Sequence, residues 1–146
     1  MVEAFVMSKN FPKHGVGFVI MLKSEKYEWV RAIKCKNKIT ANQAELYAVR
    51  YVAQSIKDGH KIRVITKNKY VSFMFDMVDG VWKKSVDTIE LNREIIIGVR
   101  SSLSQLAGFV IELREDAEEF GGLSKILADT IKSGDEYFVK QGGDTL

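Results

Sequence analysis

Glu45 is the strongest candidate for a residue that does chemistry, because its carboxylate lies on the apolar face of a predicted helix. Thr40 is a residue type that caps helix starts, and Gln43 can close a capping box with it, so the sequence predicts a helix from Thr40 to about Lys57. Steps of four, three and four residues from Glu45 reach Val49, Val52 and Ile56, which share one helical stripe. A carboxylate in a core is costly unless it is paired, hydrogen-bonded or bound to a cation. We therefore expect Glu45 either to do chemistry or to be neutralised by a partner.

The composition is that of one soluble domain. The chain has 146 residues, of which 46% are hydrophobic and 28% charged, and its net charge is +3. The single cysteine, Cys35, excludes an internal disulfide and a cysteine-rich zinc site, which is typical of a reducing, cytoplasmic or other intracellular compartment. No apolar run approaches the ~20 residues that cross a bilayer, so we expect no membrane contact. We expect one domain over residues 1–133 and a C-terminal tail over 134–146.

The predicted elements describe an α/β domain with a mixed sheet. Alternating or strongly apolar runs predict three antiparallel strands, followed by the Glu45 helix, a turn at 58–60 and a short buried strand. Two helical stretches, a last strand and a terminal helix after Gly121–Gly122 complete the chain. The predicted strands are Val2–Met7, Gly15–Leu22, Tyr27–Lys34, Ile62–Thr66 and Phe109–Leu113, and the two helical stretches are Lys69–Met77 and Ser85–Leu106.

Three segments, Val2–Ile20, Thr40–Leu46 and Ile65–Val71, resemble motifs of the ribonuclease H family. Val2–Ile20 resembles its first hairpin, Thr40–Leu46 its first-helix motif, and Ile65–Val71 its fourth-strand motif, in which Thr-Asp-Ser precedes Tyr-Val. The resemblance implies a five-stranded mixed sheet with helices on both faces. It also implies cleavage of RNA–DNA hybrids by two divalent metals, magnesium or manganese, held by four acidic residues.

The chain departs from that acidic cluster at most of its positions. Glu45 is retained, but Met7 stands where the first aspartate belongs, and Lys67 replaces the next one. A thioether is a poor ligand for magnesium, and an ammonium has no lone pair. The last acidic position falls on Asp129, which reproduces the family's Ala-Asp dipeptide, or on Ser124. We favour Ser124, because its helical neighbours make the better apolar core.

These departures predict a catalytically degenerate module that binds nucleic acid or a protein partner without cleaving. The alternative is an active metal-dependent RNA–DNA hybrid ribonuclease with a rearranged acidic site. We expect no metal site and no cofactor in the degenerate case, and magnesium or manganese only in an active enzyme. We further predict that the Lys67 ammonium pairs with Glu45 where a metal would otherwise sit.

Scattered lysines are the candidates for nucleic-acid contact, with RNA–DNA hybrid or double-stranded RNA as the ligand. They can equally be ordinary solvated side chains. Trp82 can stack on a base or anchor the core beside exposed lysines. The candidate lysines are Lys34, Lys36, Lys38, Lys69, Lys83 and Lys84.

Overall fold

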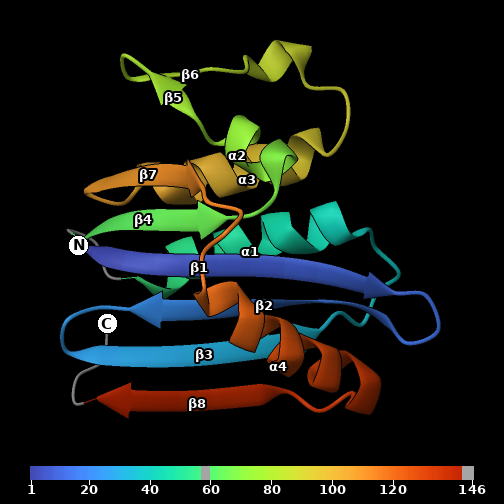
Figure 1. Cartoon of the computed structure of the whole chain (residues 1–146). Coiled ribbons are helices and arrows are strands. Elements are labelled where there is room, and N and C mark those ends of the chain that lie inside the picture. Colours follow the sequence, from blue (N-terminus) through green and yellow to red (C-terminus); the bar gives the residue numbers. More distant parts are fainter. Residues whose placement is uncertain (57–59, 143–146) are drawn as a thin grey trace.

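A six-stranded mixed sheet with helices on both faces forms the domain, and the predicted α/β class is confirmed (Figure 1). The structure is a computed structural model that describes residues 1–56 and 60–142. The strand order is β7-β4-β1-β2-β3-β8, in which β1, β4 and β7 are parallel and the other neighbours are antiparallel. The strands of this sheet are β1 Val2–Phe11, β2 Gly15–Lys23, β3 Tyr27–Lys34, β4 Lys61–Thr66, β7 Gly108–Leu113 and β8 Tyr137–Gly142.

Each face of the sheet has its own hydrophobic core. One core packs α1 (Ala41–Ser55) against the sheet and α3 (Arg93–Ser104) against α1, with α2 (Lys69–Met74) beside them. The other core packs α4 (Glu119–Ser133) against the opposite face, which is the front face in Figure 1. Gly17 of β2 permits a close approach of α4, because a Cβ there would lie 3.0 Å from Ile131 and 2.5 Å from the Ile33 carbonyl oxygen. The two cores therefore enclose the central strands β1 and β2.

The segment expected as a tail contains the sixth strand. Gly134 ends α4 with a left-handed backbone (φ 81°), and β8 then pairs with β3 in antiparallel register. The sheet thus has one strand more than the five that the resemblance implied. Large apolar side chains of β8, such as Phe138, stay largely exposed at this edge. The sequence of β8 therefore lacks the alternation of apolar and polar residues that identifies a half-buried strand.

Two predicted helices are shorter than expected. The helix from Lys69 ends at Met74, because a two-stranded hairpin of β5 (Met77–Val78) and β6 (Val81–Trp82) follows. Asp79 and Gly80 both have positive φ, as the tight turn of such a hairpin requires.

The long helix predicted over Ser85–Leu106 is wrong in its first part. A 3₁₀ turn (Val86–Thr88) comes first, Ile89 enters the core from an extended backbone, and α3 begins only after Asn92, whose φ is 61°. The terminal helix begins at Glu119, so both glycines of Gly121–Gly122 lie within it. At the end of α1, Ile56 has left the helix, and the predicted helix end at Lys57 and most of the turn at 58–60 lie outside the described residues.

Candidate functional site

The start of α1 presents Glu45 as the capping pattern predicted. The Thr40 hydroxyl accepts from the Gln43 backbone N–H at 3.1 Å, and the Gln43 side chain accepts from the Thr40 N–H at 3.0 Å, which completes the capping box. Glu45 is 4% exposed, and the rest of its stripe, Val49, Val52 and Ile56, is buried as well. The helix therefore carries a carboxyl group into the sheet.

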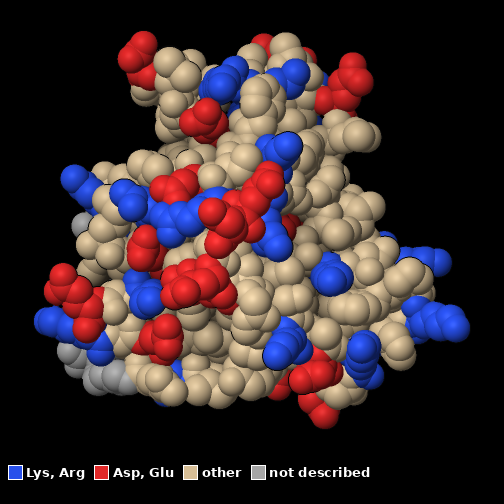
Figure 2. All heavy atoms as spheres, viewed as in Figure 1, with Lys and Arg blue, Asp and Glu red and all other residues tan. Residues whose placement is uncertain are grey.

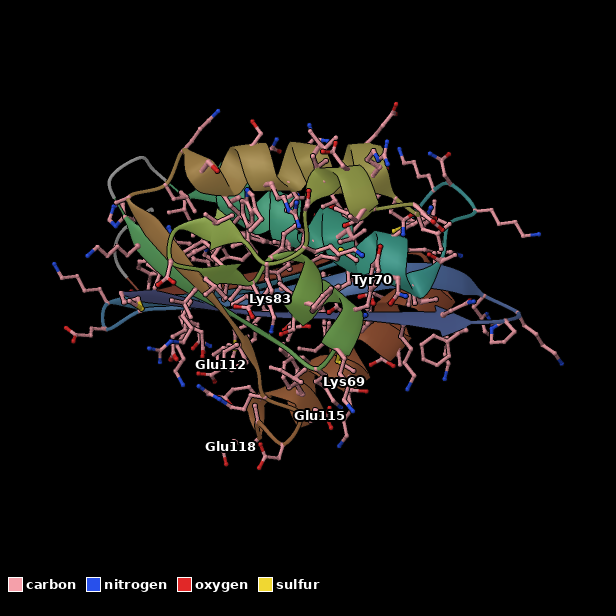
Figure 3. The ribbon with its side chains drawn as sticks, turned by 90° about the horizontal axis from the view of Figure 1, so that it is seen from above. Lys69, Tyr70, Lys83, Glu112, Glu115 and Glu118 are labelled. Atoms are coloured by element: carbon pink, nitrogen blue, oxygen red, sulfur yellow. The ribbon has the colours of Figure 1, made fainter. Side chains whose placement is uncertain are left out.

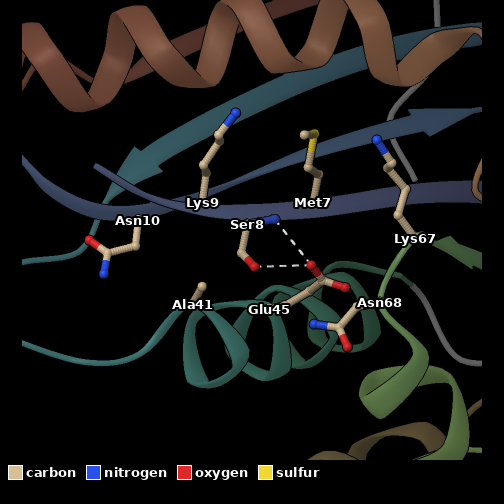
Figure 4. A pocket seen from close by; sticks show the side chains of 8 residues that line it. All are labelled: Met7, Ser8, Lys9, Asn10, Ala41, Glu45, Lys67 and Asn68. Carbon is tan, nitrogen blue, oxygen red and sulfur yellow. Dashed lines mark hydrogen bonds between the residues drawn. The ribbon is translucent and has the colours of Figure 1, made fainter. Parts of the chain in front are cut away.

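Uncharged groups donate hydrogen bonds to both oxygens of the Glu45 carboxyl group, and Figure 4 shows the two bonds from Ser8. Oε1 accepts from the Ser8 backbone N–H at 3.1 Å and from the Ser8 hydroxyl at 3.0 Å, while Oε2 accepts from the Thr66 hydroxyl. The Thr66 hydroxyl in turn accepts from the Asn68 N–H at 3.0 Å. Burial raises the pKa of Glu45 above its usual value, and the hydrogen bonds from Thr66 and Ser8 oppose that rise only in part. Glu45 is therefore accommodated in the core by hydrogen bonds from uncharged groups, and burial favours its protonated, neutral form.

The predicted Lys67–Glu45 ion pair is wrong. The Lys67 ammonium lies 5.7 Å from the centroid of the Phe120 ring, on the α4 side of the sheet. In Figure 4, Lys67 and Met7 point to one side of β1, and Glu45 lies on the other. Neighbouring residues in a strand point to opposite faces, so Ser8 and Thr66 face Glu45 while Met7 and Lys67 face α4.

Asp129 and Ser124 lie on different parts of the α4 surface. Asp129 is exposed, whereas Ser124 is half-buried. The side chains that α4 buries are Phe120, Leu123, Leu127, Thr130 and Ile131. This pattern agrees with the apolar neighbours that favoured Ser124, and which of the two residues corresponds to the family's last acidic position stays a prediction.

Two adjoining hollows lie at the end of the sheet where β1 extends beyond β4. The pairing of β1 with β4 ends at Val6 and Thr66, so the following part of β1 faces an open space. A hollow of about 410 Å³ opens there, and a second of about 600 Å³ adjoins it through the shared lining residues Asn10 and Ala41. We call the lysines that line the two hollows the lysine groove: Lys9 and Lys67 in the first, and Lys34, Lys36 and Lys38 in the second.

The other candidate lysines lie elsewhere. Lys69 is 4.0 Å from Glu115 across an exposed ion pair, and Figure 3 shows the two side by side near the start of α4. Lys83 lies 3.6 Å from Asp76, and Lys84 lines a separate hollow beside Tyr70.

Trp82 anchors the β5–β6 hairpin to the body of the domain. Its ring stacks on Phe109 with 5.5 Å between centroids, and the Arg100 guanidinium covers it at 4.7 Å. Arg100 also donates to the Met74 and Lys84 carbonyl oxygens. Both interactions match the core-anchoring interpretation of this tryptophan.

The residues of the first hollow do not fit a pair of divalent metal ions. The Glu45 oxygens already accept hydrogen bonds, and the neighbouring groups are the thioether of Met7 and the ammoniums of Lys9 and Lys67. Hard cations such as magnesium need several oxygen ligands, and nearby ammoniums repel them. Within residues 1–56 and 60–142, no three His, Cys, Asp or Glu side chains are grouped closely enough to hold a metal.

Sequence reasoning missed the residues that complete the site. Ser8 and Thr66 bind Glu45, and Lys9 and Asn10 line the hollow. The available signal was the two-residue period of the strands, because Ser8 and Thr66 each adjoin a position identified by the resemblance and must face the other side.

Comparisons with known proteins support the fold. No protein-family model and no curated protein matches the chain. Among solved structures, the chain is similar to that of LC9-RNase H1, described as a type 1 RNase H with the type 2 active-site motif. The TM-score is 0.64 at 11% identity, and the match covers 97% of this chain and 77% of the other. The chain therefore has a ribonuclease H-like fold. In the part that the structure describes, no helix has both the length and the apolar character needed to span a membrane.

Proposed function

We propose that this ribonuclease H-like domain binds nucleic acid through the lysine groove and does not cleave it. One observation carries the proposal: Glu45 is held by the uncharged donors Ser8 and Thr66, while the charged side chains of the same hollow are the cations Lys9 and Lys67. A hollow with that charge attracts phosphate groups, and a catalytic pair of divalent cations would need the opposite charge.

The second hollow extends the positive surface along the same end of the sheet. Lys36 and Lys38 are exposed, and Lys34 is half-buried at the end of β3. Lysines that contact several phosphates of a duplex supply affinity without sequence preference. Because each contact releases a counterion from the nucleic acid, the affinity falls as the salt concentration rises. Because the fold is similar to that of a ribonuclease H, the ligand that we propose is a duplex containing RNA, either an RNA–DNA hybrid or double-stranded RNA.

Fluorescence anisotropy with a labelled RNA–DNA hybrid of about 18 base pairs tests the proposal directly. Raising the salt from 50 to 200 mM should weaken binding by on the order of a hundredfold, as expected for about four phosphate contacts. Added EDTA should leave the affinity unchanged, because no metal takes part.

A matched pair of charge reversals locates the binding surface. Lys36→Glu with Lys38→Glu should weaken binding by at least about tenfold. Lys26→Glu with Lys61→Glu makes the same change in net charge at the opposite end of the sheet, where Lys26 adjoins the β2–β3 turn and Lys61 begins β4. This control should bind like the wild type. Equal losses in both variants, or no salt-dependent binding of any duplex, would overturn the proposal, and the second result would favour a protein partner.

A further inference from the structure

Three ammonium groups on the α4 side of the sheet, two of them in the lining of the first hollow, lie over aromatic rings. Lys67 lies 5.7 Å from the centroid of Phe120. Lys9 and Lys132 lie 5.4 and 5.5 Å from the centroid of Phe11, so one ring receives a lysine from the end of β1 and another from the last turn of α4. Cation–π contacts of this kind restrict a flexible side chain in advance of ligand binding.

These three lysines follow the direction of β1. Every second residue of β1 points to the α4 face, and toward the end of the strand these residues are Met7, Lys9 and Phe11. Successive members are about 6.6 Å apart along the strand at the usual rise per residue. Lys67 lies beside Met7 in the lining of the first hollow, and Lys132 joins the series at Phe11. The row therefore places positive charges at intervals along one direction, as the phosphates of a single nucleic-acid strand are placed.

The Phe11 ring brings two like charges into one neighbourhood. The Lys9 and Lys132 ammoniums lie 5.4 and 5.5 Å from its centroid, so they are at most about 11 Å apart, and an anion beside the ring is attracted by both. Both side chains are exposed, which leaves the ammoniums accessible to a ligand.

Acidic residues limit the row at its other end. Glu115, Asp116, Glu118 and Glu119 lie in or next to the loop that leads into α4. In Figure 2 the largest group of red side chains lies near the start of α4, and separate blue side chains lie over the end of the molecule that carries the β1–β2 hairpin. This charge distribution favours a path of the bound polyanion that runs from Lys67 toward Phe11 and away from the acidic loop.

We infer that Lys67, Lys9 and Lys132 form a track for the phosphodiester backbone of one nucleic-acid strand, with the Lys67 ammonium holding a phosphate that metal ions would otherwise hold. The inference rests on the proposed function and adds to it the strand path and the groups that contact it. Lys67 directly follows β4 and its ring Phe120 belongs to α4, whereas Lys9 and its ring Phe11 belong to β1. The track therefore joins the end of β4 to α4 and β1.

Salt titrations of lysine-to-methionine variants test the track, because methionine keeps an unbranched side chain and removes the charge. Lys67→Met, Lys9→Met and Lys132→Met should each lower the slope of log affinity against log salt by about 0.9. Affinity at 100 mM salt should fall about three- to tenfold for each, since one phosphate contact is lost. Lys125→Met is the matched control, because Lys125 is exposed on α4 and should leave both quantities unchanged.

A hybrid with one neutral methylphosphonate placed at successive positions identifies the contacted phosphate. At one position the loss caused by Lys67→Met should disappear, because the phosphate that it holds is already uncharged. Lys9→Met and Lys132→Met should show the same loss of effect at other positions of the same strand.

The results separate the two proposals. A steep salt slope in the wild type that none of the three variants changes would overturn the track. The proposed function would then depend on the lysines of the second hollow, which the Lys36→Glu and Lys38→Glu variant tests separately. A flat slope in the wild type would overturn both. The single-strand path would also be contradicted if the methylphosphonates that cancel the effects of the three lysine variants lie on both strands of the hybrid.

Discussion

The two sides of β1 differ at the end of the strand, where the first hollow opens. On the α1 side, Ser8 and Thr66 hold the buried Glu45 carboxyl through uncharged hydrogen bonds. On the α4 side, Lys9 and Lys67 are exposed cations that rest over aromatic rings. Residues adjacent in the chain thus differ in their surroundings: one set holds a buried carboxyl group in the fold, and the other presents exposed positive charge, to which the proposed function assigns a ligand.

The largest effect should come from the aromatic core beneath Lys67. Phe120 is 2% exposed and packs edge-on against Phe5 with 5.9 Å between centroids. Phe120→Ala should lower the free energy of unfolding by about 3–5 kcal/mol, because it removes a buried ring and leaves a cavity. Phe120→Leu should cost clearly less and still weaken hybrid binding, since the leucine fills space but cannot hold the ammonium. Urea unfolding measures the first quantity, and anisotropy the second; unchanged binding by a folded Phe120→Leu would contradict the role of the ring.

A neighbouring pair of substitutions compares the two sides of the sheet directly. Thr66→Val should lower the free energy of unfolding by about 1–3 kcal/mol, because it leaves a Glu45 oxygen and the Asn68 N–H without their partner. Lys67→Met, one residue later, should change stability by less than about 0.5 kcal/mol, because Lys67 is exposed. For hybrid binding we expect the reverse: Lys67→Met should weaken the affinity more than Thr66→Val. Equal stability losses in the two variants, measured in urea, would remove the distinction between the sides.

The next effect depends on pH and concerns Glu45 alone. Its pKa is raised by burial in the folded protein, so the folded chain keeps a proton at pH values where the unfolded chain has lost it. The group's contribution to stability is therefore complete below about pH 4.5, its usual value, and falls as the pH rises through the folded pKa. Glu45→Gln lacks this decline, and its melting temperature relative to the wild type should rise with pH across that window. A difference that stays constant from pH 4 to 8 would mean that the Glu45 pKa is not raised.

The smallest effect should come from an ion pair outside the groove. Lys69 and Glu115 are 81% and 56% exposed along their side chains and 4.0 Å apart. Lys69→Ala should change stability by less than about 0.5 kcal/mol, since water and salt screen such pairs. It should also leave the salt slope of hybrid binding nearly unchanged. A loss of slope as large as that of Lys67→Met would place Lys69 on the binding surface and widen the track.

Local signals predicted much of this fold. The capping box at Thr40, the buried stripe from Glu45 and the strand runs all depend on residues close together in the chain, and the structure confirms them. The β8 strand was missed because its apolar side chains, including Phe138, remain exposed at a sheet edge. The turn at Asp79–Gly80 had a recognisable signal, but the adjoining strands have only two residues each.

The site was predictable only in part, because its contacts depend on sheet register. Glu45 could be identified from its helix, but its partners Ser8 and Thr66 meet it only because Val6 pairs with Thr66 between parallel strands. The same alternation sends Lys67 to α4 and breaks the ion pair that sequence reasoning predicted. The rings under the lysines come from parts of the chain that adjoin only after folding.

Incubation of the protein with an RNA–DNA hybrid in magnesium or manganese tests the central claim most directly. If ammoniums hold the phosphates, the hybrid should stay intact after long incubation, and its dissociation constant should be the same in EDTA as in either metal. Glu45→Gln should not change either result at neutral pH, because its carboxyl is occupied by Ser8 and Thr66. Metal-dependent cleavage that Glu45→Gln abolishes would instead identify an active nuclease with a rearranged site.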